Sequence, residues 1–69
     1  MIKYQIITST GIDVREKEDE AALADIREYA NRHHPWLYLD GQPTNPMEVG
    51  VGALQNAQMI VLTHTILGG

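Results

Sequence analysis

The sequence contains no cysteine, and only two of its 69 residues are lysines. Without cysteine the chain forms no disulfide and offers no thiolate as a nucleophile or zinc ligand. Its longest uninterrupted apolar runs, such as MIVL at 59–62, are four residues long and far too short to cross a bilayer. The N-terminal MIKYQII lacks both the apolar core and the cleavage site of a secretory signal. We therefore expect a cytoplasmic protein that is not associated with a membrane.

Basic residues are also scarce, since five lysines and arginines stand against nine acidic residues, for a net charge of −4. An acidic chain with no basic stripe is repelled by phosphate backbones, so nucleic acid is not an expected partner. A chain of this length forms a single domain with a thin core. So small a chain does not favour an enzyme, and we expect a protein that acts through partners.

The N-terminal residues predict a β-hairpin. Apolar side chains at every second position of residues 2–7 indicate a half-buried strand, and Ile12 and Val14 continue that alternation. The TSTG segment at 8–11, which lies between them, is rich in turn residues. Two alternating segments joined by a short turn are most simply paired as a hairpin.

One amphipathic helix is predicted next, within REKEDEAALADIREYANRHH. Its apolar stripe recurs at helical spacing and consists of Leu23, Ile26, Ala30 and His33. Asp19 is predicted to cap the N-terminus of this helix. Arg32 and the two histidines that follow it lie at the other end, where the helix dipole favours cations. Pro35 is predicted to end the helix.

The C-terminal half predicts two further strands. WLYL at 36–39 reads as a short strand, and 58–66 reads as the last one. Residues 40–46 contain Asp-Gly and two prolines, so we expect them to be irregular. Residues 47–57 carry two glycines close together, so we expect irregular backbone with at most one short helical turn. The predicted fold class is α+β, a small sheet with one helix across one face.

Some residues carry weaker functional signals. His33, His34 and His64 could suggest a metal, but their spacing is not that of ligands on one helix face, and no cysteine accompanies them. We therefore predict no metal site. Trp36 and Tyr38 lie on a short strand and have two equally good interpretations, an exposed binding surface or ordinary packing. The acidic segment 13–20 is interpreted first as a solvated face and second as a docking site for a basic partner.

Three segments, taken together and in order, carry a resemblance to a known family. They are TSTG at 8–11, LYLDGQ at 37–42, and LQNAQMIVL followed by THTILGG at 54–69. These are similar to the ubiquitin segments TLTG, LIFAGK, and IQKESTLHL followed by VLRLRGG. The chain thus resembles the ubiquitin-like β-grasp family over essentially its whole length. The resemblance implies a β-hairpin, one helix and two further strands in a mixed sheet.

The resemblance implies a domain at 1–64 and a flexible tail at 65–69 that ends in Gly-Gly. In this family an ATP-dependent activating enzyme adenylates the terminal carboxylate, which implies Gly69 as the reacting residue. Gly68 would supply clearance, because residues without Cβ can thread a narrow channel. Thr65, Ile66 and Leu67 would form the segment that the activating enzyme reads.

The family also implies the partners. They are an activating enzyme, a conjugating enzyme, a deconjugating peptidase and protein targets that receive the modifier on an amine. The chain itself would bind no cofactor, since its partner consumes the ATP, and it would act as a monomer. If chains form through lysine, Lys3 and Lys17 are the available attachment points.

Departures from ubiquitin narrow this prediction. Thr65 and Leu67 stand where ubiquitin has arginines, so we expect a dedicated activating enzyme and not the eukaryotic ubiquitin activator. The positions that match the apolar interaction patch of ubiquitin are Tyr38, Gly41, Val61 and Thr63, which predict a more polar and aromatic surface. The compact form and the missing basic tail favour a prokaryotic or phage type.

Two alternative functions remain open. One is a sulfur carrier, similar to those of thiamin and molybdopterin synthesis, whose terminal glycine becomes a thiocarboxylate. The other is a non-covalent β-grasp interaction module in which the glycines have no chemical role.

Overall fold

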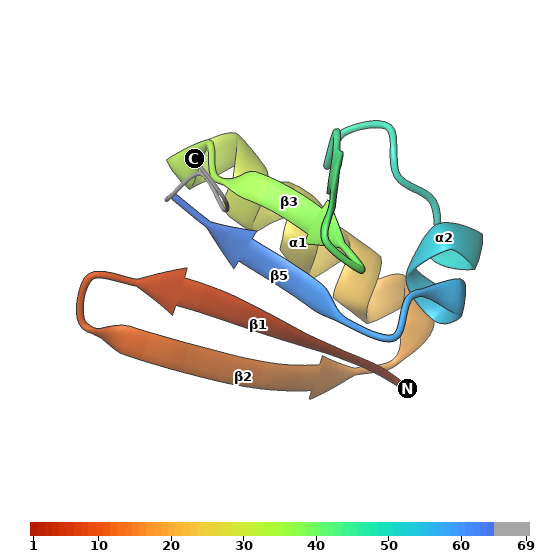
Figure 1. The fold of residues 1–69 in the computed structure, drawn as a ribbon. Helices are drawn as coiled ribbons and strands as arrows, with labels where there is room; N and C mark the ends of the chain where they lie inside the picture. The colour runs from red at the N-terminus through yellow and green to blue at the C-terminus, as the bar shows by residue number, and fades with distance from the viewer. Residues whose placement is uncertain (65–69) are drawn as a thin grey trace.

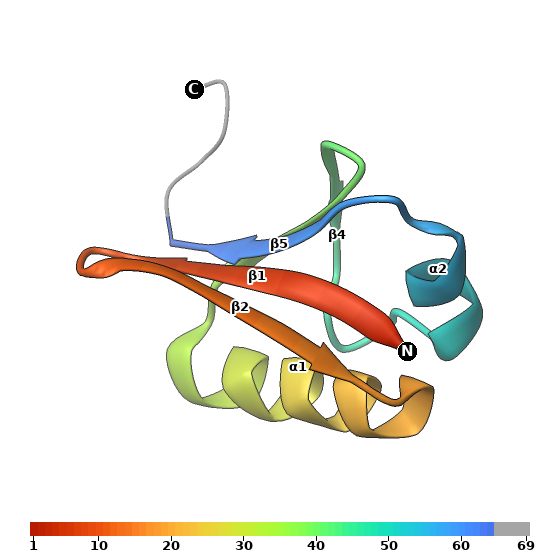
Figure 2. The same ribbon diagram turned by 90° about the horizontal axis from the view of Figure 1, so that it is seen from below.

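A computed structural model of the chain describes residues 1–64 and shows an α+β fold, a five-stranded mixed sheet with one main helix against one face (Figures 1 and 2). The elements in order are β1 Ile2–Thr8, β2 Gly11–Lys17, α1 Asp19–His33, β3 Trp36–Leu39, β4 Gln42–Thr44, α2 Val51–Asn56 and β5 Ile60–Thr63. The strand order is β2-β1-β5-β3-β4, and β1 and β5 are parallel. This arrangement confirms the predicted fold class and is consistent with a β-grasp-like architecture.

The predicted N-terminal hairpin is confirmed, and its second strand is longer than expected. All seven residues of β2 pair with β1, from Thr8 opposite Gly11 to Ile2 opposite Lys17. The turn is closed by the Thr8 hydroxyl, which donates to the carbonyl of Gly11 at 3.2 Å. Gly11 has a φ of 142°, a conformation that favours glycine.

The main helix has its predicted C-terminus, but the prediction that Asp19 caps its N-terminus is wrong. The capping position is Glu18, whose carbonyl accepts from the amide of Ala22 at 2.7 Å, with no side-chain capping bond. The Asp19 carboxylate instead faces the terminal ammonium of Met1 and the amide of Gln55. At the other end His34 adopts a left-handed conformation directly before the proline that stops the helix.

The prediction that residues 40–46 are irregular is wrong over β4. Asp40 and Gly41 both have positive φ, at 51° and 83°, and form the two-residue turn of a second hairpin. Pro43 lies opposite Tyr38, one pair beyond the pair that closes the turn. Its nitrogen therefore points away from β3, and a proline on this edge strand disturbs no ladder hydrogen bond.

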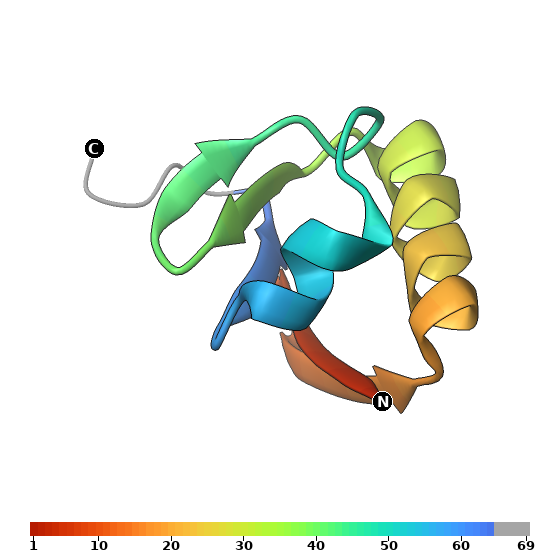
Figure 3. The same cartoon turned by 90° about the vertical axis from the view of Figure 1, so that its right-hand side faces the viewer.

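The last strand is shorter than predicted and begins at Ile60. The amides of Gln58 and Met59 donate to the Asp40 carboxylate at 2.9 and 2.8 Å, so these residues continue no strand ladder. The segment before them contains the six-residue helix α2 with Gly50 at its N-cap, which is longer than the single short turn that was expected. Figure 3 shows α2 closing the end of the space between α1 and the sheet.

The core lies between α1 and the sheet. Its buried residues are Ile2, Tyr4, Ile6, Ala22, Ile26, Leu37, Val49, Leu54, Ile60 and Leu62. The central strand β5 is buried on both faces along its whole length. Neither of the helices at 1–64 has the length and apolarity needed to cross a bilayer.

Candidate functional site

One face of the sheet points away from α1 and lies outside the core, and we call it the outer sheet face. Because side chains alternate along a strand and Leu37 and Leu62 face the helix, Trp36, Tyr38 and Val61 face outward. The register aligns these side chains into two rows that run across the strands. The row nearest the end of β5 is Ile12, Ile7, Thr63 and Trp36, and the second is Val14, Gln5, Val61, Tyr38 and Pro43.

The exposed large apolar side chains of the outer sheet face lie at its two flanks. Ile12 and Val14 on β2 are 62% and 51% exposed, and Trp36 on β3 is 49% exposed. These three exposed apolar residues make the outer sheet face the candidate docking surface of the described residues. Trp36 therefore favours the first of its two sequence interpretations, whereas Tyr38 is 5% exposed and favours packing.

The predicted interaction patch is only partly assembled. Tyr38 lies opposite Val61, and Thr63 follows on the same face, but all three side chains are buried. Gly41 is exposed in the β3–β4 turn, at the far end of these strands from Thr63. A partner would therefore meet this face first at the flanking residues. The alternation of Ile12 and Val14 predicted only an apolar strand face, and the structure leaves that face exposed.

The end of β5 lies in the middle of the sheet. Thr63 is flanked by Ile7 on β1 and by Trp36 on β3. Strand β5 thus ends within the first outward row. The predicted tail residues Thr65, Ile66, Leu67, Gly68 and Gly69 lie outside the residues that the structure describes.

An aromatic cluster joins the end of β5 to the last turn of α1. The ring centroids of Tyr29 and His33 are 4.5 Å apart, and each lies 6.4 Å from the ring of His64. His33, His34 and His64 were considered together from the sequence, and the fold brings His33 to His64 but leaves His34 in the turn. Within 1–64 no group of three or more histidine, aspartate or glutamate side chains is placed to hold a metal ion.

The two lysines differ in their surroundings. The Lys17 ammonium lies 3.8 Å from the Asp25 carboxylate. Lys3 lies on the outer sheet face, opposite Glu16 in the register of β1 and β2. Lys3 is exposed on that strand, so it is the less encumbered of the two as an attachment point.

Asp25 is the centre of a partly buried network of ion pairs and hydrogen bonds. Its carboxylate accepts from the Tyr4 hydroxyl and from Arg15 Nη1, the latter at 2.9 Å. Burial alone would raise the pKa of Asp25, but these hydrogen bonds outweigh it and hold the pKa below its usual range. Burial and the same hydrogen bond raise the pKa of Tyr4. The network ties β1, β2 and α1 together and serves the fold.

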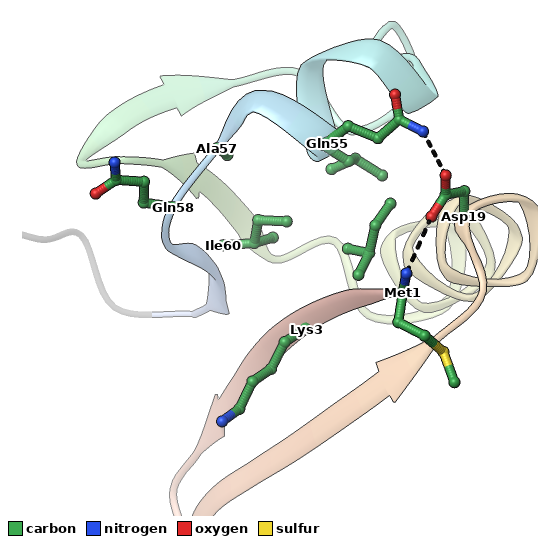
Figure 4. Close-up of a pocket in the computed structure, with 9 residues that line it drawn as sticks. Met1, Lys3, Asp19, Gln55, Ala57, Gln58 and Ile60 are labelled. Carbon is green, nitrogen blue, oxygen red and sulfur yellow. Dashed lines mark hydrogen bonds and ion pairs between the residues drawn. The ribbon is translucent and has the colours of Figure 1, made fainter.

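A hollow of about 340 Å³ lies at the opposite end of β1 from Thr63, beside α2 (Figure 4). Figure 4 shows the Asp19 carboxylate between the terminal ammonium of Met1, 3.7 Å away, and the amide of Gln55. The side chains of Lys3 and Gln58 point away from this carboxylate. Since the Asp19 carboxylate and the terminal ammonium of Met1 already engage each other, the hollow offers less to a ligand than the outer sheet face does.

Comparison of the chain with protein-family models, with curated proteins and with solved structures gives no match. The fold, the outer sheet face and the place where β5 ends are therefore the observations on which a functional proposal rests.

Proposed function

We propose that this chain is a ubiquitin-like protein modifier, activated at Gly69 by a cognate ATP-dependent enzyme and conjugated to amines of target proteins. The proposal requires a free carboxylate on Gly69. Gly68 and Gly69 supply the two residues without side chains that an adenylating pocket can admit. The preceding residues Thr65, Ile66 and Leu67 form the segment that the enzyme reads, partly through backbone hydrogen bonds.

The observation that carries this proposal is the position of β5. It is the central strand of a β-grasp-like sheet and ends between Ile7 and Trp36, so the Gly-Gly segment is attached at the middle of a rigid scaffold. Six residues can span at most about 20 Å, which is enough to reach a site inside a partner that docks on the sheet. A scaffold of this kind presents one reactive terminus and one docking face at the same end of the molecule.

The outer sheet face is assigned to partner recognition. Its exposed flanks, Ile12 and Val14 on one side and Trp36 on the other, border the row from which the Gly-Gly segment continues. An exposed tryptophan is the kind of residue that dominates binding energy at protein interfaces. The buried Tyr38, Val61 and Thr63 hold these flanks in register, and Gly41 is left as a more distant contact.

The chemistry proceeds in three transfers. The Gly69 carboxylate attacks the α-phosphorus of ATP, which releases pyrophosphate and leaves an acyl adenylate. An enzyme thiolate then displaces AMP to form a thioester. Finally a target amine displaces the thiolate, with loss of its proton, to form an amide. In a chain with only two lysines, Lys3 and Lys17 are the sites for self-conjugation.

The test is a charging assay with the purified chain, ATP and a candidate activating enzyme from the same organism. We expect a thioester adduct that thiol reagents cleave and that deletion of Gly68 and Gly69 abolishes. A matched control variant, Glu28→Gln, changes an exposed helix residue on the other side of the molecule and should charge normally. Absence of any adenylate or thioester with the intact chain would refute the proposal.

The same assay separates the two alternatives. A sulfur carrier would also be adenylated, but mass spectrometry would find the terminal carboxylate converted to a thiocarboxylate and no branched peptide on a target. An interaction module would bind its partner equally well after deletion of the two glycines. Conjugation itself would appear as a branched peptide carrying Gly69 on a target lysine or N-terminus.

A further inference from the structure

The free edge of β2 is the longest exposed strand edge in the part of the chain that the structure describes. There β2 pairs with β1 alone, and six of its seven residues are exposed. Figure 1 shows β2 as the outermost strand of the sheet, on the side away from β3. A strand edge of this length is a ready template for another strand, and proteins either protect such an edge or use it.

The direction of the backbone groups of β2 follows from the hairpin. The pair Thr8–Gly11 closes a two-residue turn and exchanges both of its hydrogen bonds, and such pairs alternate with pairs that exchange none. Consequently the amides and carbonyls of Ile12, Val14 and Glu16 point away from β1. A second strand can therefore bond to β2 only at these three residues.

The side chains of β2 are complementary to a second copy of the same strand. If two β2 strands pair antiparallel about Val14, this residue faces its own counterpart, and Ile12 faces Glu16 of the second copy. Asp13 then faces Arg15 of the second copy, and the symmetry repeats this opposite-charge pair. Within one chain Asp13 and Arg15 already form an ion pair at 2.9 Å, and their side chains are 53% and 34% exposed, so pairing about Val14 brings the ion pairs of the two copies next to each other.

The other registers with the same backbone directions are worse. A centre at Asp13 or at Arg15 places two copies of that charged residue opposite each other. Shifting the centre to Glu16 places two Glu16 carboxylates opposite each other and Arg15 opposite Lys17 of the second copy. Shifting it to Ile12 moves part of the pairing into the Ser9–Thr10 turn and leaves Asp13 opposite a glycine. Only the register about Val14 combines all three outward residues with attractive charge pairs.

We propose that β2 is a self-association edge through which two copies of this chain pair antiparallel about Val14 and join their sheets. The exposed Val14 and Ile12 of both copies then lie side by side on one continuous outer sheet face. This pairing differs from the monomer expected from the sequence, and it requires neither the Gly-Gly segment nor any enzyme. A failed charging assay would therefore not refute the β2 pairing, and a failure to dimerise would not refute the proposed modifier function.

The test uses the full chain in sedimentation equilibrium and amide exchange, from about 10 μM to about 1 mM. We expect a concentration-dependent dimer. The amide hydrogens of Ile12, Val14 and Glu16 should gain protection as the dimer forms. Those of Asp13 and Arg15, which already bond to β1, should not change. A monomer at the highest concentration, or protection that appears elsewhere, would overturn the proposal.

Two charge reversals on the same strand test the register. Asp13→Arg places two like-charge pairs in the interface and should weaken self-association by about tenfold or more. Glu16→Arg makes the same change in net charge but faces an apolar residue, so association should remain within about threefold of wild type. Equal weakening by both variants would show a general charge effect and refute the register.

A proline substitution tests the pairing in a chain that stays folded. Val14→Pro removes one outward amide and leaves the ladder with β1 intact, in the way that Pro43 is accommodated on β4. It should abolish dimers while circular dichroism stays that of the folded chain. A folded Val14→Pro variant that still dimerises through β2 would contradict the proposal.

Discussion

Asp25 is the residue at which charge ties β1, β2 and α1 together. Tyr4 and Arg15 both donate to its carboxylate, and the lowered pKa of Asp25 records how strongly they favour the charged form. The sequence placed Asp25 on the predicted helix without any special role. Its partners come from two other elements and are 21 and 10 residues away, so local pattern could not identify them.

The lowered pKa of Asp25 predicts a loss of stability in acid. The folded pKa lies below the usual 3.8, so this contribution is complete above the unfolded pKa and is lost as pH falls through the folded one. In urea titrations between about pH 2 and pH 7, Asp25→Asn should be less stable by about 1–3 kcal/mol at neutral pH. The difference from wild type should shrink below about pH 4.

Glu28→Gln is the matched control for this titration. Glu28 pairs with Arg32 on the exposed side of the same helix, 3.4 Å apart, and such pairs contribute about 0.5 kcal/mol or less. A pH profile of Asp25→Asn parallel to wild type would show that the network contributes nothing to acid stability. Tyr4 acts in the opposite range, since its raised pKa gives stability that is present below about pH 10 and is lost at higher pH.

A second prediction concerns the contribution of the Asp40 side chain to stability. Its carboxylate accepts from the amides of Gln58 and Met59, which joins the β3–β4 turn to the start of β5. Asp40→Ala leaves both amides without this partner and should lower the free energy of unfolding by about 1–3 kcal/mol in urea denaturation. Asp40→Asn keeps one acceptor oxygen and the left-handed turn, so it should recover much of that loss. Equal effects of the two substitutions would contradict this role.

The β3–β4 hairpin is the element that sequence reasoning missed. Two prolines argued against regular structure, yet Asp-Gly is also the residue pair that a two-residue hairpin turn favours. The hairpin forms because Pro43 lies on an edge strand, one pair beyond the turn, where the ladder does not need the amide that proline lacks. Whether a proline is tolerated depends on which neighbour its nitrogen faces, and that is a property of the assembled sheet.

Substitution of two glycines, one in the β3–β4 turn and one in α2, should change stability in opposite directions. Gly41 has a φ of 83°, so Gly41→Ala should destabilise the fold by about 1–2 kcal/mol. Gly52 lies within α2, where a Cβ would meet nothing within 4 Å. Gly52→Ala should therefore stabilise by about 0.5–1 kcal/mol. Thermal melts followed by circular dichroism measure both, and shifts of the same sign would refute the pair of assignments.

At the scale of the whole molecule, the two faces of the sheet have separate tasks. The face against α1 holds the core, and the outer sheet face presents Ile12, Val14 and Trp36 to solvent. Substitutions on the two faces should therefore separate stability from recognition. The proposed β2 pairing adds to this division, because it would extend the outer sheet face without touching the core.

One pair of substitutions tests that division. Leu62 is fully buried on β5, so Leu62→Ala should cost about 2–5 kcal/mol, which approaches the whole stability of a domain this small. Trp36→Ala removes a half-exposed side chain and should cost about 1 kcal/mol or less in urea denaturation. In the charging assay Trp36→Ala should nevertheless raise the concentration needed for half-maximal charging by about tenfold. An unchanged charging curve would remove Trp36 from the recognition surface.

The sequence by itself determined the elements whose patterns are local. Alternation specified β1 and β3, helical spacing specified α1, and Pro35 ended that helix, because each signal depends on neighbours within a few residues. The Gly-Gly motif and the resemblance to ubiquitin are likewise properties of the sequence alone, and the proposed function still depends on them.

Only the tertiary structure decided which residues meet. It placed β5 between β1 and β3, brought His33 to His64, joined Asp25 to Tyr4 and Arg15, and buried the predicted patch while exposing Ile12 and Trp36. The physical reason is that strand order and register are set by burial summed over the whole sheet, which no short segment encodes. The same cause leaves β2 at an edge of the sheet. Only at an edge can its charge pattern favour pairing with a second copy, and the sequence alone did not show that position.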